Sequence, residues 1–228
     1  MDIGKSFSYV FEDEKWISKV LVGGLFVLAS FILVGIPFLM GYMLQTMRNV
    51  MQGLERPLPE WDNLGEKFKE GLILIIIVII WTIPIWVLQG IAAIAGVGLV
   101  GMSGNSDLAG GAVGIFSICF SCLVSLYALA IAVLWPALYI RFARAPEFKT
   151  GFEFAEIWQF TKDNIGNIII ALLLMIVAGI ISSFGAILCG VGILFTYFWY
   201  FLVYAHLLGQ VWLRRKGDGG EWSQPAVV

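Results

Sequence analysis

The chain has 228 residues, of which 60% are hydrophobic and 13% are charged. A soluble globular domain has about 45–50% apolar and about 25% charged residues, so this composition excludes a water-soluble protein. The formal net charge of −2 gives no field that would attract nucleic acid, and we expect no nucleic-acid partner. The partner that the composition predicts is the lipid bilayer.

Long stretches without Asp, Glu, Lys or Arg dominate the chain and occur at Val20–Met47, Gly71–Ser106, Leu108–Ile140 and Asn164–Leu213. About 20 apolar residues in helical conformation span the hydrocarbon core of a bilayer, so each stretch is long enough to cross it. The last stretch is long enough to cross twice, and its Gly-rich centre from Phe184 to Gly192 predicts a turn. We therefore expect an all-α, polytopic transmembrane helical bundle.

Basic residues predict the orientation of this bundle. Lys and Arg occur in segments 1–19, 48–70, 141–163 and 214–216, whereas segments 102–111 and 185–192 have none. Because basic loops stay on the cytoplasmic side, both ends of the chain are expected there. This orientation requires an even number of crossings before Arg48, although only one apolar stretch precedes it.

A turn at Gly35-Ile36-Pro37 would satisfy this requirement by dividing the first stretch into helices Trp16–Val34 and Pro37–Gly53. Proline is tolerated at a helix start because its missing N–H would be unpaired there. The segment 32–42 also resembles the segment 187–197, where the other turn is expected. The alternative is one long helix kinked at Pro37, which gives five helices and an external N-terminus.

The expected organisation is a single domain over residues 1–216 with about six membrane helices in three hairpins, at about 16–53, 72–140 and 164–213. Amphipathic cytoplasmic connectors follow at 54–71 and 141–163, and the polar tail 217–228 is expected to be disordered. In the first connector, Asp62 would cap a short helix lying in the headgroup plane, with Leu64, Phe68 and Leu72 on its apolar face.

Several residues in the first third of the chain carry a resemblance to a known family. They are Gly41-Tyr42, Arg48-Asn49, Gly53, the run from Pro57 to Asp62, Phe68 and Gly71-Leu72. In these residues the chain resembles the prokaryotic membrane family of unknown function DUF4013. The resemblance implies a multi-pass protein of a bacterial or archaeal cell membrane and implies no activity.

Polar residues near the first connector form one candidate site, which comprises Gln45, Arg48, Asn49, Glu60, Trp61 and Asp62. The first three lie along one side of the predicted helix 37–53, and the others follow it closely. Together they could bind a lipid headgroup, a small solute or a protein partner. Alternatively, they could fix the connector in place.

His206 and Gln210 form a second candidate, since they lie one turn apart on the last predicted helix. An ionisable residue within a membrane helix is a functional candidate by default. The alternative is a histidine that only hydrogen-bonds to a neighbouring helix or to interfacial water.

Patterns that could indicate catalysis lack the context that catalysis requires. Gly96–Gly101 matches a dinucleotide-binding pattern but ends an apolar stretch, and Cys119 and Cys122 have no second ligand pair for a metal. Ser117, Ser121 and Ser125 have no acid or base nearby. We expect no catalytic, metal or cofactor site and no cofactor.

The sequence therefore favours a non-enzymatic membrane protein that acts by assembly, partner binding or lipid interaction. The partner could be a second copy of the chain or another membrane protein. A small-solute transporter or channel is the alternative, supported by the Pro- and Gly-interrupted helices. A membrane-embedded lipid enzyme is the third possible function.

Overall fold

The computed structural model describes residues 2–102, 107–187 and 191–217. These residues form helices and loops and contain no strand, which confirms the predicted all-α class. The chain divides into two compact units, residues 1–76 with 136–228 and residues 77–135. Each unit is described by itself.

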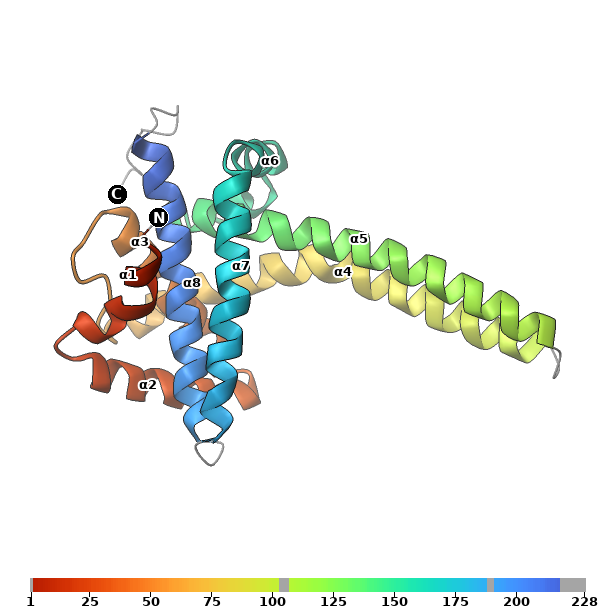
Figure 1. Ribbon diagram of the computed structural model, residues 1–228, viewed down its shortest axis with the longest axis horizontal. Coiled ribbons are helices and arrows are strands. Elements are labelled where there is room, and N and C mark those ends of the chain that lie inside the picture. The colour runs from red at the N-terminus through yellow and green to blue at the C-terminus, as the bar shows by residue number, and fades with distance from the viewer. Residues whose placement is uncertain (1, 103–106, 188–190, 218–228) are drawn as a thin grey trace. The chain divides into compact units, whose positions relative to one another are not determined.

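The first unit contains all of the short helices and both chain ends (Figure 1). Its elements in chain order are α1 (Ile3–Ser8), η1 (Tyr9–Glu12), α2 (Trp16–Ala29), η2 (Ser30–Ile32), α3 (Gly35–Met51), the start of α4 (Leu64–Met102), the end of α5 (Asp107–Arg144), η3 (Phe148–Phe152), α6 (Phe154–Asp163), α7 (Ile165–Ser183), η4 (Phe184–Ile187) and α8 (Gly192–Gly217). α8 is central, since it contacts α1, α2, α3 and α7.

The core of this unit forms where α2 and α3 pack on α8. α7 stands beside α8, whereas α2 passes across it (Figure 1). Gly23 and Gly24 of α2 allow this close crossing, because a Cβ atom on Gly23 would lie 2.3 Å from the ring of Phe198. Phe198 and Leu202 of α8 are buried at this contact. Helix packing at van der Waals distance, with small residues at the crossing, is how helices associate in lipid.

The chain reverses between α2 and α3 and is not merely kinked there. α2 ends at Ala29, η2 follows, Leu33 adopts a left-handed conformation (φ 65°), and α3 then packs against α2. The break lies a few residues before the predicted Gly35-Ile36-Pro37, and Pro37 stands in the first turn of α3, where its missing N–H costs no helical hydrogen bond. The matching segment in the last hairpin is also a short 3-10 turn, η4.

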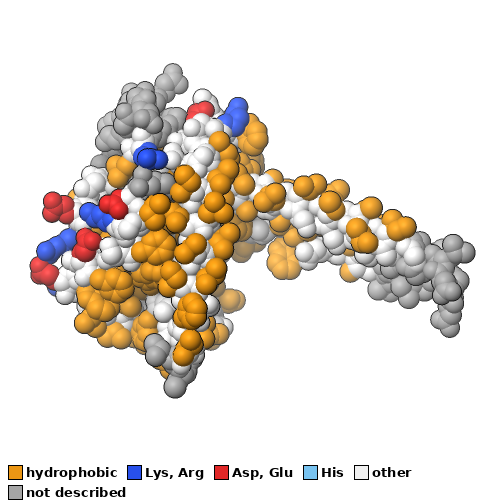
Figure 2. All heavy atoms as spheres, viewed as in Figure 1, with side chains coloured by type: hydrophobic (Ala, Val, Ile, Leu, Met, Phe, Trp, Pro, Cys, Tyr) orange, Lys and Arg blue, Asp and Glu red, His pale blue; other side chains and the backbone are white. Residues whose placement is uncertain are grey.

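The second unit consists of the outer parts of α4 and α5, residues 77–135. Tyr127 Oη donates a hydrogen bond to the carbonyl of Trp81 (3.1 Å) and so joins the two helices. Many large apolar side chains in this unit are exposed, among them Trp86, Ile94 and Ile118. Figure 2 shows that hydrophobic side chains also cover the visible face of α7. Water would disfavour such a surface, and lipid accommodates it.

The helices support a polytopic membrane protein, but the number of crossings differs from the prediction. Long apolar helical segments that can cross a bilayer are 64–95, 114–144, 165–187 and 192–214. α2 and α3 have 14 and 17 residues and are short for a full crossing. The bent pair Ile3–Glu12 and Trp16–Ile32 would raise the count of spans from four to five. Six full crossings therefore remain a prediction.

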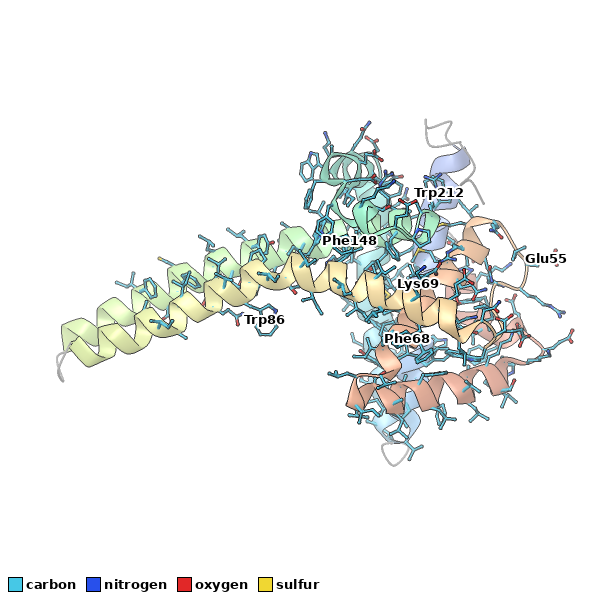
Figure 3. All side chains as sticks on the ribbon, turned by 180° about the vertical axis from the view of Figure 1, so that it is seen from behind. Glu55, Phe68, Lys69, Trp86, Phe148 and Trp212 are labelled. Carbon is cyan, nitrogen blue, oxygen red and sulfur yellow. The ribbon has the colours of Figure 1, made fainter. Side chains whose placement is uncertain are left out.

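The start of α4 corrects the prediction for the first connector. No separate helix lies between Asp62 and Leu72, because α4 begins at Leu64 and continues unbroken into the apolar stretch. Of the predicted apolar face, Phe68 contacts Phe38 of α3 with tilted rings (5.0 Å between centroids), whereas Leu64 and Leu72 are exposed. Lys67 and Glu70 are instead the buried side chains of this part of α4. Phe68 and Lys69 project from different sides of this part of α4 (Figure 3).

Candidate functional site

The loop 52–63 between α3 and α4 is the part of the predicted first connector that lies outside α4, and the name is kept for this loop below. It turns back along α3 instead of leaving it. Three consecutive carbonyl groups of this segment each accept a hydrogen bond from a side chain. Asn49 Nδ2 donates to Pro57 (2.8 Å), and Tyr42 Oη donates to Pro59 (2.8 Å). The third donor, to the Leu58 carbonyl between them, is Lys19 Nζ. Irregular backbone close to lipid needs such internal partners, because an unpaired polar group there costs several kcal/mol.

Lys19 is a buried cation with two further contacts. Its side chain is 6% exposed, and Nζ lies 2.8 Å from Asp13 Oδ2 and 3.0 Å from the Leu58 carbonyl. The Glu60 carboxylate lies 3.3 Å from the same Nζ. Burial of Asp13 acts to raise its pKa, but hydrogen bonds from Lys19 Nζ and the Lys15 N–H, with the charges of Lys19 and Arg56, outweigh burial and lower it.

Trp61 joins the first connector to three helices. Its ring stacks on Tyr42 of α3 (4.2 Å between centroids) and on Phe26 of α2 (4.8 Å), and it lies 5.8 Å from Phe198 of α8. Its indole Nε1 donates to the carbonyl of Lys19 (2.9 Å). Trp61 is therefore packed against the core of the first unit.

α3 and α4 meet at two glycines. A Cβ atom on Gly41 would lie 2.0 Å from the carbonyl oxygen of Lys67, and one on Gly71 would lie 1.9 Å from that of Pro37. Such an approach of two backbones is possible only without side chains. It brings Gln45 and Arg48 of α3 close to the charged first turns of α4.

A small cavity of about 60 Å³ lies between these helices. Its lining consists of Gln45, Arg48, Glu66, Lys67 and Glu70. The Arg48 guanidinium forms an ion pair with Glu70, whose side chain is 10% exposed. Lys67 Nζ, on a side chain that is 4% exposed, donates to the carbonyl and the carboxylate of Asp62 (2.5 and 3.0 Å).

The predicted residues of this first candidate thus divide into two groups. Asn49 and Trp61 are bound to backbone, while Glu60 and Asp62 form ion pairs with Lys19 and Lys67. These contacts hold the first connector against the helices. Gln45 and Arg48 instead line the cavity.

His206 and Gln210 of α8 contact the N-terminal segment. His206 Nδ1 lies 3.0 Å from Ser6 Oγ, and its ring stacks on Tyr9 with 4.4 Å between centroids. Gln210 Nε2 donates to the carbonyl of Asp2 (3.1 Å). The histidine is 4% exposed, and both side chains bond to the N-terminal segment.

Sequence reasoning did not select the partners of these residues. Lys19, Lys67 and Glu70 were treated only as charges that indicate orientation or an amphipathic helix. One available signal was the helical spacing of Lys67 and Glu70 on the side of α4 that also carries the buried Leu74. No local pattern could reveal that Ser6 and Tyr9 meet a residue about 200 positions later.

The comparison with known proteins gives a family. The family model described as "Protein of unknown function (DUF4013)" matches residues 24–191, more than half of the chain. Neither a curated protein nor a solved structure matches the chain. The residues that carried the resemblance include Tyr42, Asn49, Trp61 and Gly71, which hold the first connector and the crossing of α3 with α4. The resemblance is confirmed, and the chain belongs to the DUF4013 family.

Proposed function

We propose that this protein is a non-enzymatic, multi-pass protein of the cell membrane that binds a phospholipid headgroup at its cytoplasmic face. The observation that carries the proposal is the cavity between α3 and the start of α4, which is lined by charged and amide side chains alone. Such a lining suits a polar ligand, and its position beside an apolar stretch suits an amphiphile.

The position of the cavity along α4 supports a lipid. Its lining residues on α4 end at Glu70, and the stretch without charges begins at Gly71. Glu66 and Ile73 are seven residues apart, so they lie on the same side of the helix. Ile73 is only partly buried. A headgroup in the cavity would therefore have an apolar path for its acyl chains along the same side of α4.

The contacts of the chain ends support a cytoplasmic location for this face. The hydrogen bond from Gln210 to the Asp2 carbonyl holds the N-terminal segment against the C-terminal half of α8. Both ends are then on one side of the first unit, which agrees with an even number of crossings. Basic residues occur in both end segments and in 48–70, and such segments stay in the cytoplasm.

The surroundings of the ionisable residues support a role without catalysis. His206 is enclosed by Ser6 and Tyr9, and Lys19 is bound to Asp13 and the Leu58 carbonyl. A general acid or base must reach the proton that it transfers, and these groups are already bonded within the protein.

The proposal is tested by native mass spectrometry of the full chain, purified in mild detergent and mixed with phospholipids. We expect one phospholipid to remain bound, and Gln45→Leu to reduce its retention by roughly tenfold, since a hydrogen bond to a charged group is worth about 1.5–3 kcal/mol. Gln52→Leu is the matched control, because Gln52 is exposed at the end of α3, outside the cavity lining. Equal retention by both variants, or no retention by the wild type, would refute lipid binding at this cavity.

A further inference from the structure

Two side chains of α3 that line the cavity have hydrogen-bonding capacity that the described residues do not use. The terminal nitrogen of Arg48 is paired with Glu70, but its Nε atom is buried and has no partner among the described residues. The Gln45 side chain also makes no hydrogen bond within the part of the chain that the structure describes. A buried guanidinium nitrogen normally has an acceptor, so Arg48 retains an unused hydrogen-bond donor beside the cavity that it lines.

One acidic side chain of the cavity also has no ion-pair partner among the described residues. Glu70 pairs with Arg48, whereas Glu66 forms no ion pair with any described residue. Lys67, the other nearby cation, is bonded to Asp62. The cavity therefore offers unused donors from α3 and an unused carboxylate from α4.

We infer that the cavity accepts a zwitterionic headgroup with a primary amine, namely phosphoethanolamine of a membrane lipid. The inference rests on the proposed function and names its ligand class. The phosphate would accept hydrogen bonds from Arg48 Nε and the Gln45 amide, because guanidinium groups bind phosphate with strong, directed hydrogen bonds. The ammonium group would donate to the Glu66 carboxylate.

Charge balance and hydrogen-bond donation both separate this headgroup from others. The lining holds two cations, Arg48 and Lys67, and two acids, Glu66 and Glu70, so it is neutral overall. An anionic headgroup would leave Glu66 beside a phosphate without a cation, which is repulsive. A trimethylammonium group has no N–H and so cannot donate a hydrogen bond to the Glu66 carboxylate.

The test titrates the full-length protein in detergent micelles with phosphatidylethanolamine, phosphatidylcholine and phosphatidylglycerol of identical acyl chains, with native mass spectrometry as the readout. We expect the ethanolamine lipid to bind roughly tenfold more tightly than the other two. Glu66→Gln should remove this preference by weakening the ethanolamine lipid alone. Glu55→Gln is the charge-matched control, because Glu55 lies on the outer edge of the first connector (Figure 3).

Each result of this test has one meaning. Retention without headgroup preference, a preference for phosphatidylglycerol, or no effect of Glu66→Gln would overturn the zwitterion assignment and leave lipid binding standing. Absence of any bound lipid would overturn the proposed function itself. A further arm adds soluble phosphoethanolamine; if it displaces the lipid at equal concentration, the ligand is a free solute and the lipid assignment is wrong. Because Glu66 is exposed, its variant should fold, which an unchanged unfolding midpoint would verify.

Discussion

Lys15 and Lys19 lie one helical turn apart at the start of α2, and both form ion pairs, yet their surroundings differ. The side chain of Lys15 is 68% exposed beside Glu60, whereas that of Lys19 is 6% exposed beside Asp13. An exposed pair gains little because water and salt screen it. A buried pair is different, because removing one partner leaves the other charge desolvated.

Lys19→Met should therefore lower the free energy of unfolding by about 3–5 kcal/mol, since it leaves the Asp13 carboxylate without its cation and the Leu58 carbonyl without its donor. Lys15→Met is the matched control and should cost about 0–1 kcal/mol. Equilibrium unfolding in mixed detergent micelles measures both. Similar losses for the two variants would show that burial of Lys19 is not as described.

The same ion pair predicts a pH dependence. The pKa of Asp13 is lowered in the folded protein, so the folded state binds fewer protons than the unfolded state in the acid range. The stabilisation is complete above the ordinary aspartate pKa of about 3.9 and is lost as the pH falls through the lowered value. Unfolding midpoints of the wild type should fall steeply below about pH 4, and more steeply than those of Asp13→Asn. Equal slopes would contradict this assignment.

Asn49 tests whether the first connector depends on its side-chain donors. Asn49→Leu would leave the Pro57 carbonyl without its partner and should destabilise the protein by about 1–3 kcal/mol. Gln52→Leu removes an exposed amide from the same helix and should change stability by less than about 0.5 kcal/mol. A substitution of Met47 would be a poor control for Asn49→Leu, because Met47 is fully buried. The same micelle unfolding experiment separates the two amides.

At the scale of elements, the position of α4 depends on its crossing with α3. Gly71→Ala would place a Cβ atom 1.9 Å from the Pro37 carbonyl oxygen, so the helices must move apart. We expect a loss of stability of about 1–3 kcal/mol or more, as in other overpacked contacts. Gly65→Ala in the first turn of α4 meets no atom within 4 Å and should be neutral or stabilising. Destabilisation by both substitutions to the same degree would contradict a close crossing.

α3 and α5 both carry, near their C-terminal ends, an arginine that forms an ion pair with the following part of the chain. Arg48 near the end of α3 pairs with Glu70 of α4, and Arg141 near the end of α5 pairs with Glu153 and Glu156 around the start of α6. In both places a cation in the last turn also interacts favourably with the helix dipole.

Sequence periodicity and composition were sufficient for the helices, because long charge-free stretches have few alternatives. They located the reversal before α3 to within a few residues, since Gly and Pro disfavour helix continuation. They did not locate the end of α2 at Ala29, because the left-handed residue there is Leu33, which carries no turn signature. The course of the first connector was also unpredictable, since it depends on side chains such as Lys19 that are distant in sequence.

For the molecule as a whole, we propose an orientation in which the segments 48–70 and 141–163 of this polytopic membrane protein share the cytoplasmic side. Composition and the long apolar helices support the membrane location. Basic residues support the orientation, which the arrangement of helices alone leaves open. The proposed lipid site inherits this orientation, because its lining residues lie within 45–70.

The most direct test is cysteine labelling of intact cells with a reagent that does not cross the membrane. Cys119, Cys122 and Cys189 would be replaced by alanine, and single cysteines would be placed at Asn63 and at Ser106. We expect labelling at position 106 in intact cells, and labelling at position 63 only after the cells are opened. Strong external labelling at position 63, with none at position 106, would contradict the orientation and with it the cytoplasmic lipid site.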